Sequence, residues 1–276
     1  MFGLKKKLQG QMRKALDEVL DFLGIARHSI EYFKILGGVY LAGGAIISAI
    51  DDQKANDLDI FIEDEGIAKI LANRLLNIEP IRRNKFTIEF NKDELNDKLI
   101  RGNISGDIAA CNSELSNSSY LLRYVSKNAF SFKNGIQLIF RFIGEPEEVF
   151  TTFDYEHCKV AYKLSAVDSG VIQFLGQSSE AIATRSLIYT GRSRFVCSAL
   201  SRMIKFSSRG WKLSPQVLLN LLASCLKIDW SSLKAVEEEL LGFYSLTPEH
   251  VQSVLDELSQ KENFSIKEVA ELVEGL

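Results

Sequence analysis

The chain has 276 residues, of which 46% are hydrophobic and 25% charged, and its 33 Lys and Arg against 36 Asp and Glu give a formal net charge of −3. This composition is that of a folded globular protein and excludes collagen-like, disordered and low-complexity chains. Because the net charge is small, any contact with nucleic acid depends on a local basic patch.

The cysteines and the apolar runs indicate the compartment. The four cysteines lie far apart and form no C-x-x-C pair, which argues against a zinc ribbon or a redox dithiol and favours a reducing cytoplasm. No apolar run approaches the roughly 20 residues of a membrane span. The first residues mix charged with apolar groups, unlike a signal peptide. We therefore expect a cytoplasmic protein that does not span a membrane.

Residues 4–23 predict an amphipathic helix, because their apolar residues follow mostly helical spacing. Five cations crowd its first half: Lys5, Lys6, Lys7, Arg13 and Lys14. They form either a solvated helix face or a contact for an acidic membrane or nucleic acid. The solvated face is the expectation adopted here, with no membrane partner.

The helical spacing of apolar residues ends before residues 37–62. They predict a buried strand at VYLAG, a tight turn at Gly43-Gly44, a short helix at AIISAI and a second strand at DLDIFI. The segments that follow predict a helix at 66–77, a strand at 85–90, loops around a short helix at 91–118, and a hairpin of NAFSF and IQLIFRF closed at 133–135.

Helical patterns dominate from Pro146 onward, and the tail predicts three helices around 231–241, 248–260 and 266–274. Ser265 and Glu268 stand at capping-box spacing at the start of the last one. The expected fold class is α+β, with a small mixed β-sheet head domain followed by an all-α C-terminal domain. We expect an N-terminal helix in 1–30, the head domain in 31–165 and a helical neck and body domain in 166–276.

The segment with the clearest chemistry is Gly43-Gly44 followed, after twelve residues, by Asp57-Leu58-Asp59. In a strand, Asp57 and Asp59 project from the same face, about 7 Å apart along the chain. Two such carboxylates repel each other unless a cation neutralises them, and Mg²⁺ prefers oxygen ligands of this kind. Paired glycines ahead of a helix let backbone N–H groups approach a phosphate.

The order strand, Gly-Gly turn, short helix and D-x-D strand resembles the head of the DNA polymerase β superfamily of nucleotidyltransferases. The twelve-residue gap resembles in particular the tRNA CCA-adding and bacterial poly(A) polymerase branch, with its GG-x-V-R-D and D-x-D motifs. The resemblance implies that Asp57 and Asp59 hold two Mg²⁺ ions, with Mn²⁺ as an alternative. It also implies that Gly43 and Gly44, helped by Ser48, bind the β- and γ-phosphates of an NTP.

Two later segments extend the resemblance. Residues 154–162 are similar to the D-F-T-x-N-A-x-A-Y motif of that branch, and residues 201–215 resemble part of its helical neck. Asp154 is then either a third metal ligand or the cap of a helix that begins at Tyr155. Arg202 and Lys205 are either a cradle for the triphosphate or a solvated basic face. Residues 128–162 also resemble uncharacterised nucleotidyltransferase-like proteins of large tailed phages.

The departures from the branch concern substrate choice. Ile47-Ser48 stand where the branch has Arg-Asp, and Thr152-Phe153 replace an Arg-Arg pair. The base-reading element falls on Phe195, Val196 and Ala199, which cannot hydrogen-bond a base edge. Selection of CTP and ATP therefore does not follow from the resemblance.

The expected function is metal-dependent transfer of a nucleoside monophosphate from an NTP to a hydroxyl acceptor, with release of pyrophosphate. The resemblance favours an RNA 3′ end, such as that of a tRNA, as the acceptor. The alternatives are transfer to a protein or small molecule, and a non-catalytic nucleotide- or RNA-binding protein.

His28, His157 and His250 share no ligand spacing, which argues against a His metal site or a Ser-His-Asp triad. The sequence predicts no oligomeric state.

Overall fold

The computed structural model describes residues 2–55, 57–94, 96–164, 170–193, 195–241, 243, 246–261 and 263–275. Their contacts divide the chain into two compact units. Unit 1 contains Met1–Thr151 and Cys158–Ser178, and unit 2 contains Thr152–His157 and Ser179–Leu276. The N-terminal helix belongs to unit 1, and the expected boundary at 165/166 lies outside the described residues.

Unit 1 is built on a mixed sheet, which has nine strands among the described residues. The strands are β1 (Val39–Ala42), β2 (Leu58–Ile62), β3 (Thr87–Lys92), β4 (Ile100–Ser105), β5 (Leu122–Val125), β6 (Ala129–Phe132), β7 (Ile136–Ile143), β8 (Val160–Lys163) and β9 (Val171–Phe174). Their order is β3-β4-β7-β2-β1-β8-β9, and β6 joins β5 to β7. Only the β2–β7 pair among them is parallel. The predicted mixed sheet with helices is confirmed.

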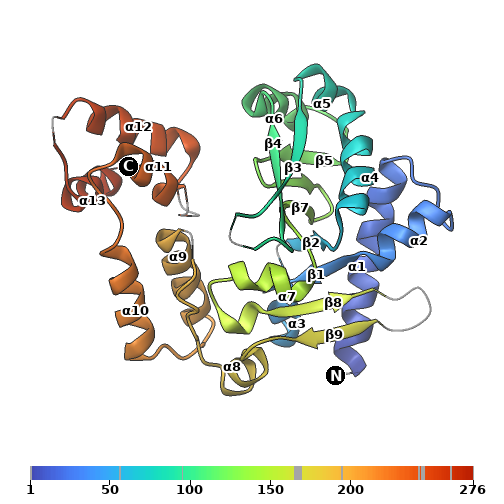
Figure 1. Ribbon diagram of the computed structural model, residues 1–276, viewed down its shortest axis with the longest axis horizontal. Coiled ribbons are helices and arrows are strands. Elements are labelled where there is room, and N and C mark those ends of the chain that lie inside the picture. The colour runs from blue at the N-terminus through green and yellow to red at the C-terminus, as the bar shows by residue number, and fades with distance from the viewer. Residues whose placement is uncertain are drawn as a thin grey trace. The chain divides into compact units, whose positions relative to one another are not determined.

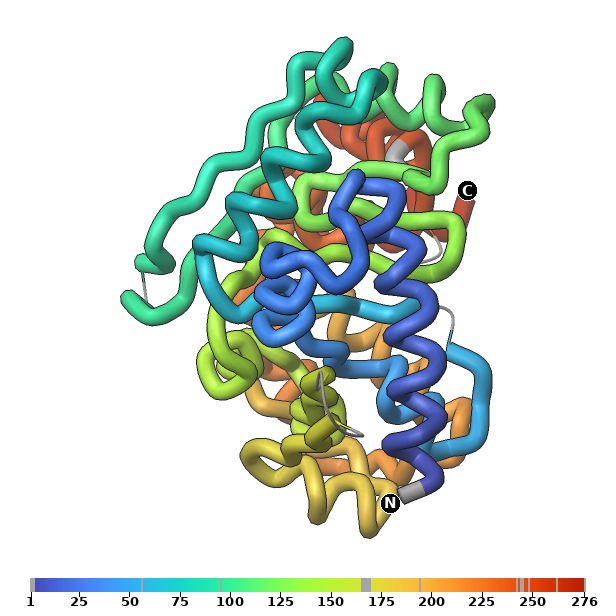
Figure 2. The backbone as a smooth tube through the Cα atoms, turned by 90° about the vertical axis from the view of Figure 1, so that its right-hand side faces the viewer, coloured from blue at the N-terminus to red at the C-terminus, as the bar shows by residue number. Residues whose placement is uncertain are grey.

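The helices of unit 1 include the two that cover the centre of the sheet. They are α1 (Phe2–Phe22), α2 (Ile30–Gly37), α3 (Gly44–Ile50), α4 (Glu65–Leu76), α5 (Glu79–Arg83), α6 (Ile108–Ser116) and α7 (Pro146–Val149). Helix α1 packs on α3 and β7, and α4 packs on β2, β3 and β7 (Figure 1). Figure 2 shows α1 as a long helix in front of the strands of unit 1. Leu8, Met12 and Leu16 are buried, so the predicted apolar face of this helix is confirmed.

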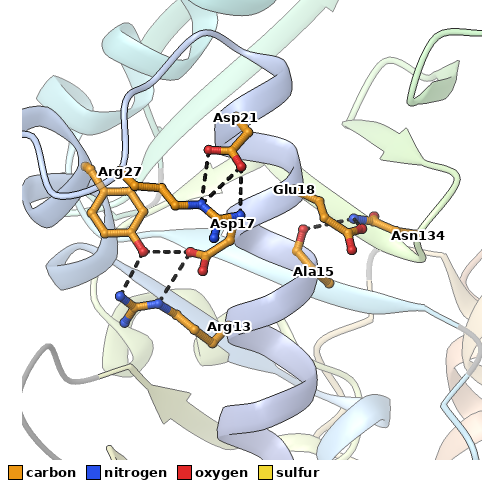
Figure 3. A network of polar contacts seen from close by, with 8 residues as sticks. Arg13, Ala15, Asp17, Glu18, Asp21, Arg27 and Asn134 are labelled. Atoms are coloured by element: carbon orange, nitrogen blue, oxygen red, sulfur yellow. Dashed lines mark hydrogen bonds and ion pairs between the residues drawn. The ribbon is translucent and has the colours of Figure 1, made fainter.

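Polar contacts hold the outer face of α1 (Figure 3). Tyr32 on α2 donates its hydroxyl hydrogen to Asp17 at 2.7 Å and accepts a hydrogen bond from Arg13 at 2.8 Å. Asn134, in the β6–β7 turn, donates to the carbonyl oxygen of Ala15 at 2.8 Å. Lys7 forms an ion pair with Asp52 at 2.8 Å. Arg13 also forms an ion pair with Asp17 at 3.4 Å, so two of the five basic side chains are paired with carboxylates of the protein.

Several elements differ from the sequence-based expectation. The stretch 91–118 contains a strand, β4, beside its helix, and no element was predicted at the positions of α2 and β5. The prediction that helices dominate after Pro146 is wrong for β8 and β9. Strand β8 is short and pairs with β1 and β9, so it forms through partners that lie outside its own sequence window.

Unit 2 is helical. Its helices are α8 (Ser178–Thr184), α9 (Val196–Ser207), α10 (Pro215–Cys225), α11 (Leu233–Leu240), α12 (Pro248–Ser259) and α13 (Ile266–Glu274). The last three, all predicted, bury one apolar cluster made of Val236, Leu240, Val251, Val254, Leu258 and Val269. The predicted capping box is confirmed, because Glu268 accepts a hydrogen bond from the Ser265 backbone N–H at 2.9 Å.

The structure also bears on the cysteines and on membrane-spanning helices. All four cysteines are free thiols, three of them buried. Within the described residues, no helix combines the length and the low polarity that crossing a bilayer requires.

Candidate functional site

The turn between β1 and α3 contains the two predicted glycines. Gly43 has φ 74° and ψ −140°, a backbone conformation that side chains with a Cβ rarely adopt. Its N–H points to the carbonyl oxygen of Val160 on β8 at 3.4 Å, which fixes the start of the turn. Gly44 begins α3, and a Cβ placed on it would meet no atom within 4 Å. Gly43 itself is buried and Gly44 is partly exposed, so Gly44 is the position of this turn that a group can approach.

Ser48 lies on the inner side of the same helix. Its side chain is only 4% exposed, and the neighbouring Ile47 is fully buried. The residue pair that departs from the Arg-Asp of the resembling enzymes therefore faces the interior of unit 1. A role for Ser48 in phosphate binding remains a prediction.

Asp57 and Asp59 lie at the start of β2. Asp57 is exposed and directly precedes the strand, and Asp59 is half-buried within it. The Leu58 N–H between them donates to the carbonyl oxygen of Gly135 at 2.8 Å, which holds this end of β2 beside the β6–β7 turn. Asp57 precedes β2, so the shared face of the two carboxylates, which strand alternation predicts, stays a prediction.

Antiparallel pairing brings the glycine turn and the aspartates to the same sheet edge. Leu41 on β1 is level with Ile60 on β2, so continuing the register places Ala42 level with Asp59. Gly43 and Gly44 come immediately after Ala42. The two motifs that the sequence separates by twelve residues thus meet at one edge.

A row of polar residues continues from Asp59 across the sheet. Asp59 pairs in register with Gln137 on β7. Gln137 pairs in turn with Ser131 on β6, and Ser131 pairs with Tyr124 on β5. Level residues on neighbouring strands point to the same face. The Gln137 side-chain amide donates to the Tyr124 hydroxyl at 3.3 Å, across two strands. We call Asp59, Gln137, Ser131 and Tyr124 the polar row.

The sequence analysis missed the last three residues of this row. Gln137 does interrupt an apolar strand, but a single polar residue on a half-exposed strand is an ordinary feature. Only the register of four strands shows that it lies beside Asp59.

The fit of a divalent cation can be judged from the donor set. Across the described parts of the chain, no three His, Cys, Asp or Glu side chains come together in a group that could hold a metal. Mg²⁺ often uses only one or two protein carboxylates and takes its other ligands from water and substrate phosphates. Asp57 and Asp59 fit that mode of binding, in which the ion enters together with an NTP.

Asp154 belongs to unit 2 and has a cationic partner there. Its carboxylate accepts a charge-assisted hydrogen bond from Arg202 on α9. The helix expected to begin at Tyr155 is absent: Tyr155 forms an isolated bridge with Tyr189, and only one 3-10 turn, Glu156–Cys158, follows. Asp154 therefore does not cap such a helix, and its role as a metal ligand remains a prediction.

The neck helix α9 carries the two predicted cationic residues. Arg202 is half-exposed and paired with Asp154, and Lys205 is exposed in the last turn of the helix. Phe206 and Ala199 are buried, as expected from their spacing. Whether Arg202 and Lys205 bind a triphosphate stays a prediction.

His157 is the buried ionisable residue of this region. Its ring lies between Phe206 and Trp211, with ring centroids 4.3 Å from each. It is fully buried, and neither ring nitrogen has a hydrogen-bond partner among the described residues. Burial lowers the pKa of His157 to about 3, so the ring is neutral and packs as an aromatic side chain.

A comparison with protein families identifies the relatives of this chain. Residues 4–185 match the model of the family described as "Gabija anti-defense 2 family protein", which is well over half of the chain. The chain belongs to the Gabija anti-defense 2 family.

A curated member of the Gabija anti-defense 2 family, from Bacillus phage SPbetaL7, is 22% identical over 210 residues. The alignment covers 71% of this chain and 50% of that protein, so the chain spans about half the length of the relative. The region that matches the family model, residues 4–185, contains the whole β1–α3–β2 site and the polar row.

Solved structures similar to this family member include CCA-adding enzymes. The Thermotoga maritima CCA-adding enzyme complexed with tRNA-CCA is 13% identical, with a TM-score of 0.43, and the alignment covers 87% of this chain and 54% of that enzyme. A CCA-adding enzyme in complex with CTP is 14% identical, with a TM-score of 0.44 and coverages of 87% and 53%. TM-scores below 0.5 do not establish a common fold.

Proposed function

We propose that this family member is a metal-dependent nucleotidyltransferase that acts against the defence for which its family is named. It transfers a nucleoside monophosphate from an NTP to a hydroxyl acceptor, and an RNA 3′ end is the acceptor proposed first. The observation that carries the proposal is the shared sheet edge of the Gly43-Gly44 turn and the Asp57, Asp59 pair.

The glycine turn binds the phosphates, and the aspartates bind the metal ions. The open backbone at Gly44 receives the β- and γ-phosphates, because N–H groups at the start of a helix bind anions. Asp57 and Asp59 would hold the divalent ions, two Mg²⁺ or Mn²⁺. When bound, such ions neutralise the triphosphate and lower the pKa of the acceptor hydroxyl.

The chemical step follows from this arrangement. The acceptor oxygen forms a bond to the α-phosphorus as the bond from that phosphorus to the β-phosphate oxygen breaks. Pyrophosphate leaves with the oxygen of the broken bond, and the hydroxyl proton passes to solvent. Asp59, half-buried beside Gln137, orients the acceptor oxygen, and the more exposed Asp57 faces the side from which the NTP enters.

The first test measures transfer directly. The full chain is incubated with each α-labelled NTP, Mg²⁺ or Mn²⁺, and one of three acceptors: total tRNA, a protein lysate or small-molecule hydroxyls. We expect label on RNA, and loss of labelling by a factor of at least ~10³ in Asp57→Asn and Asp59→Asn. The exposed Asp97→Asn serves as the matched control, because it removes a carboxylate from the β3–β4 connection of the same unit.

The result separates the alternatives. Label on protein or on a small acceptor would support nucleotidyl transfer with a different acceptor. NTP binding without any transfer would support a non-catalytic binding protein. Transfer that persists in both aspartate variants would refute the assigned roles.

The second test concerns the biological role. Cells that carry the Gabija defence are infected with a sensitive phage while they express the wild-type chain, Asp59→Asn or Asp97→Asn. We expect plaque formation to be restored by the wild type and by Asp97→Asn. Restoration by Asp59→Asn as well would show that the anti-defence role does not need the transfer reaction.

A further inference from the structure

A basic pocket lies at the far end of the polar row, on unit 1. It has a volume of about 460 Å³ and is lined by Asn112, Leu115, Ser116, Arg123, Tyr124 and Lys133. Two of these side chains are cationic and none is acidic. A pocket with this charge favours an anionic ligand.

A β-bulge places the arginine in this pocket. Leu122 is level with Phe132 and Tyr124 with Ser131, so Arg123 is one extra residue on β5. The guanidinium carbon of Arg123 lies 5.9 Å from the centre of the Tyr124 ring, within cation–π range. Bulges commonly re-aim a side chain next to a functional site. Here the extra residue puts a cation and an aromatic face together.

Lys133 supplies the second cation. It directly follows β6, and its ammonium group donates to the carbonyl oxygen of Ser118 at 2.7 Å. This bond uses one of the three ammonium hydrogens. Lys133 is exposed, so the remaining hydrogens can reach a phosphate oxygen.

Tyr124 connects the pocket to the aspartates. Its ring lines the pocket, and its hydroxyl accepts a hydrogen bond from Gln137, the residue level with Asp59. Between them, Ser131 is 3% exposed, and its hydroxyl has no hydrogen-bond partner among the described residues. Three strand spacings separate Asp59 from Tyr124, a path of about 14 Å along the sheet face.

We propose that the polar row and its basic pocket bind the acceptor strand, and that this acceptor is a single-stranded nucleic acid. The inference rests on the proposed transfer reaction. The terminal hydroxyl lies at Asp57 and Asp59, and the preceding nucleotides cross Gln137. A base stacks on Tyr124 while Arg123 and Lys133 hold phosphates. Aromatic faces combined with cations are the usual means of binding single strands without sequence preference.

The test measures strand binding without catalysis. Fluorescence anisotropy follows a labelled oligoribonucleotide, and separately an oligodeoxynucleotide of the same sequence, with the full chain, no NTP and EDTA present. Arg123→Gln is expected to reduce the slope of log affinity against log salt by about 0.7, and the double variant with Lys133→Gln by about 1.4. Tyr124→Ala is expected to weaken binding roughly 10-fold or more, and Tyr124→Phe much less.

Lys127→Gln is the matched control. Lys127 is an exposed cation between β5 and β6 that does not line the pocket, so its replacement should leave the affinity unchanged. Thermal unfolding of each variant checks that the fold is retained. Affinity that is unchanged in the Arg123, Lys133 and Tyr124 variants, or reduced equally by Lys127→Gln, would overturn the proposal.

Two further measurements separate this inference from the proposed reaction. Asp97→Asn, which lies in neither site, should bind the strand and transfer the nucleotide as the wild type does. Strand binding that depends on Arg123 without any transfer by the wild type would refute the reaction but not the pocket. Competition by free NTP or by triphosphate at the Arg123 pocket would assign it to the nucleotide and overturn the acceptor role.

Discussion

The ring of His157 packs against the indole of Trp211, with ring centroids 4.3 Å apart and planes inclined by 34°. Phe206 meets the same ring edge-on at 4.3 Å. Burial lowers the pKa of this imidazole to about 3, so the folded protein binds this proton much more weakly than the unfolded chain does. Protonation and unfolding of unit 2 are therefore linked.

The first prediction concerns acid stability. The unfolded chain takes up a proton on His157 below about pH 6.5, whereas the folded chain does so only near pH 3. The stabilisation is therefore complete above about pH 6.5 and declines as the pH falls towards about 3. We expect this residue alone to lower the free energy of unfolding by roughly 2 kcal/mol between pH 7 and pH 5. Urea unfolding at the two pH values measures the change.

His157→Phe should weaken this pH dependence, because Phe keeps the ring and has no proton to gain. The control is His28→Asn, since His28 is exposed and has φ 63°, a conformation that Asn tolerates. An unchanged pH dependence in His157→Phe would show that other groups cause the acid sensitivity.

The second prediction concerns the Asp154–Arg202 ion pair. Arg202→Gln leaves a carboxylate whose side chain is 8% exposed without its cation, and we expect a loss of about 1–3 kcal/mol in the free energy of unfolding. Asp154→Asn should cost less, because it removes the buried charge as well.

The same variants test the predicted metal role of Asp154. If Asp154 is a ligand, the thermal midpoint of the wild type should rise with Mn²⁺ plus NTP, and that of Asp154→Asn should not. An equal rise in both proteins would restrict Asp154 to the ion pair.

The third prediction separates the two glycines of the turn. Gly43→Ala should destabilise the protein by about 1–3 kcal/mol, because it forces a Cβ into a conformation suited to glycine. Gly44→Ala should leave stability unchanged or raise it by up to about 1 kcal/mol, because the position is helical and has free space. NTP binding, measured by calorimetry, should nevertheless weaken in Gly44→Ala. Undiminished NTP affinity would remove Gly44 from the phosphate site.

The fourth prediction concerns the close approach of β4 and β7. A Cβ on Gly102 would lie 2.3 Å from the carbonyl oxygen of Phe140, so Gly102→Ala must push the two strands apart. We expect a loss of about 2–4 kcal/mol. Gly37→Ala, where a Cβ meets no atom within 4 Å, should be nearly neutral in the same unfolding experiment.

Local sequence patterns were sufficient to predict the secondary structure of much of unit 1. The segment from Val39 to Ile62 was predicted as strand, turn, helix and strand because each piece carries its own signal: a buried run, two glycines and an alternating strand. The tail helices were predicted for the same reason, and the Ser265–Glu268 cap is a contact within one helical turn.

Elements stabilised by distant partners could not be predicted in this way. Strand β8 reads as part of a helical stretch, yet Tyr162 pairs with Leu41 on one side and Ile172 on the other. The same limit applies to the candidate site. Asp57 and Asp59 were found from their spacing, whereas Gln137 and Tyr124 reach the site only through the register of the sheet.

The path of the chain between the two units has a practical consequence. It leaves unit 1 after Thr151, contributes Thr152–His157 to unit 2, and returns at Cys158 before its final departure after Ser178. No single truncation can therefore express either half intact: a fragment ending near residue 178 would carry His157 without Phe206 and Trp211. Dissection of this protein needs point substitutions or a permuted gene rather than deletion of one end.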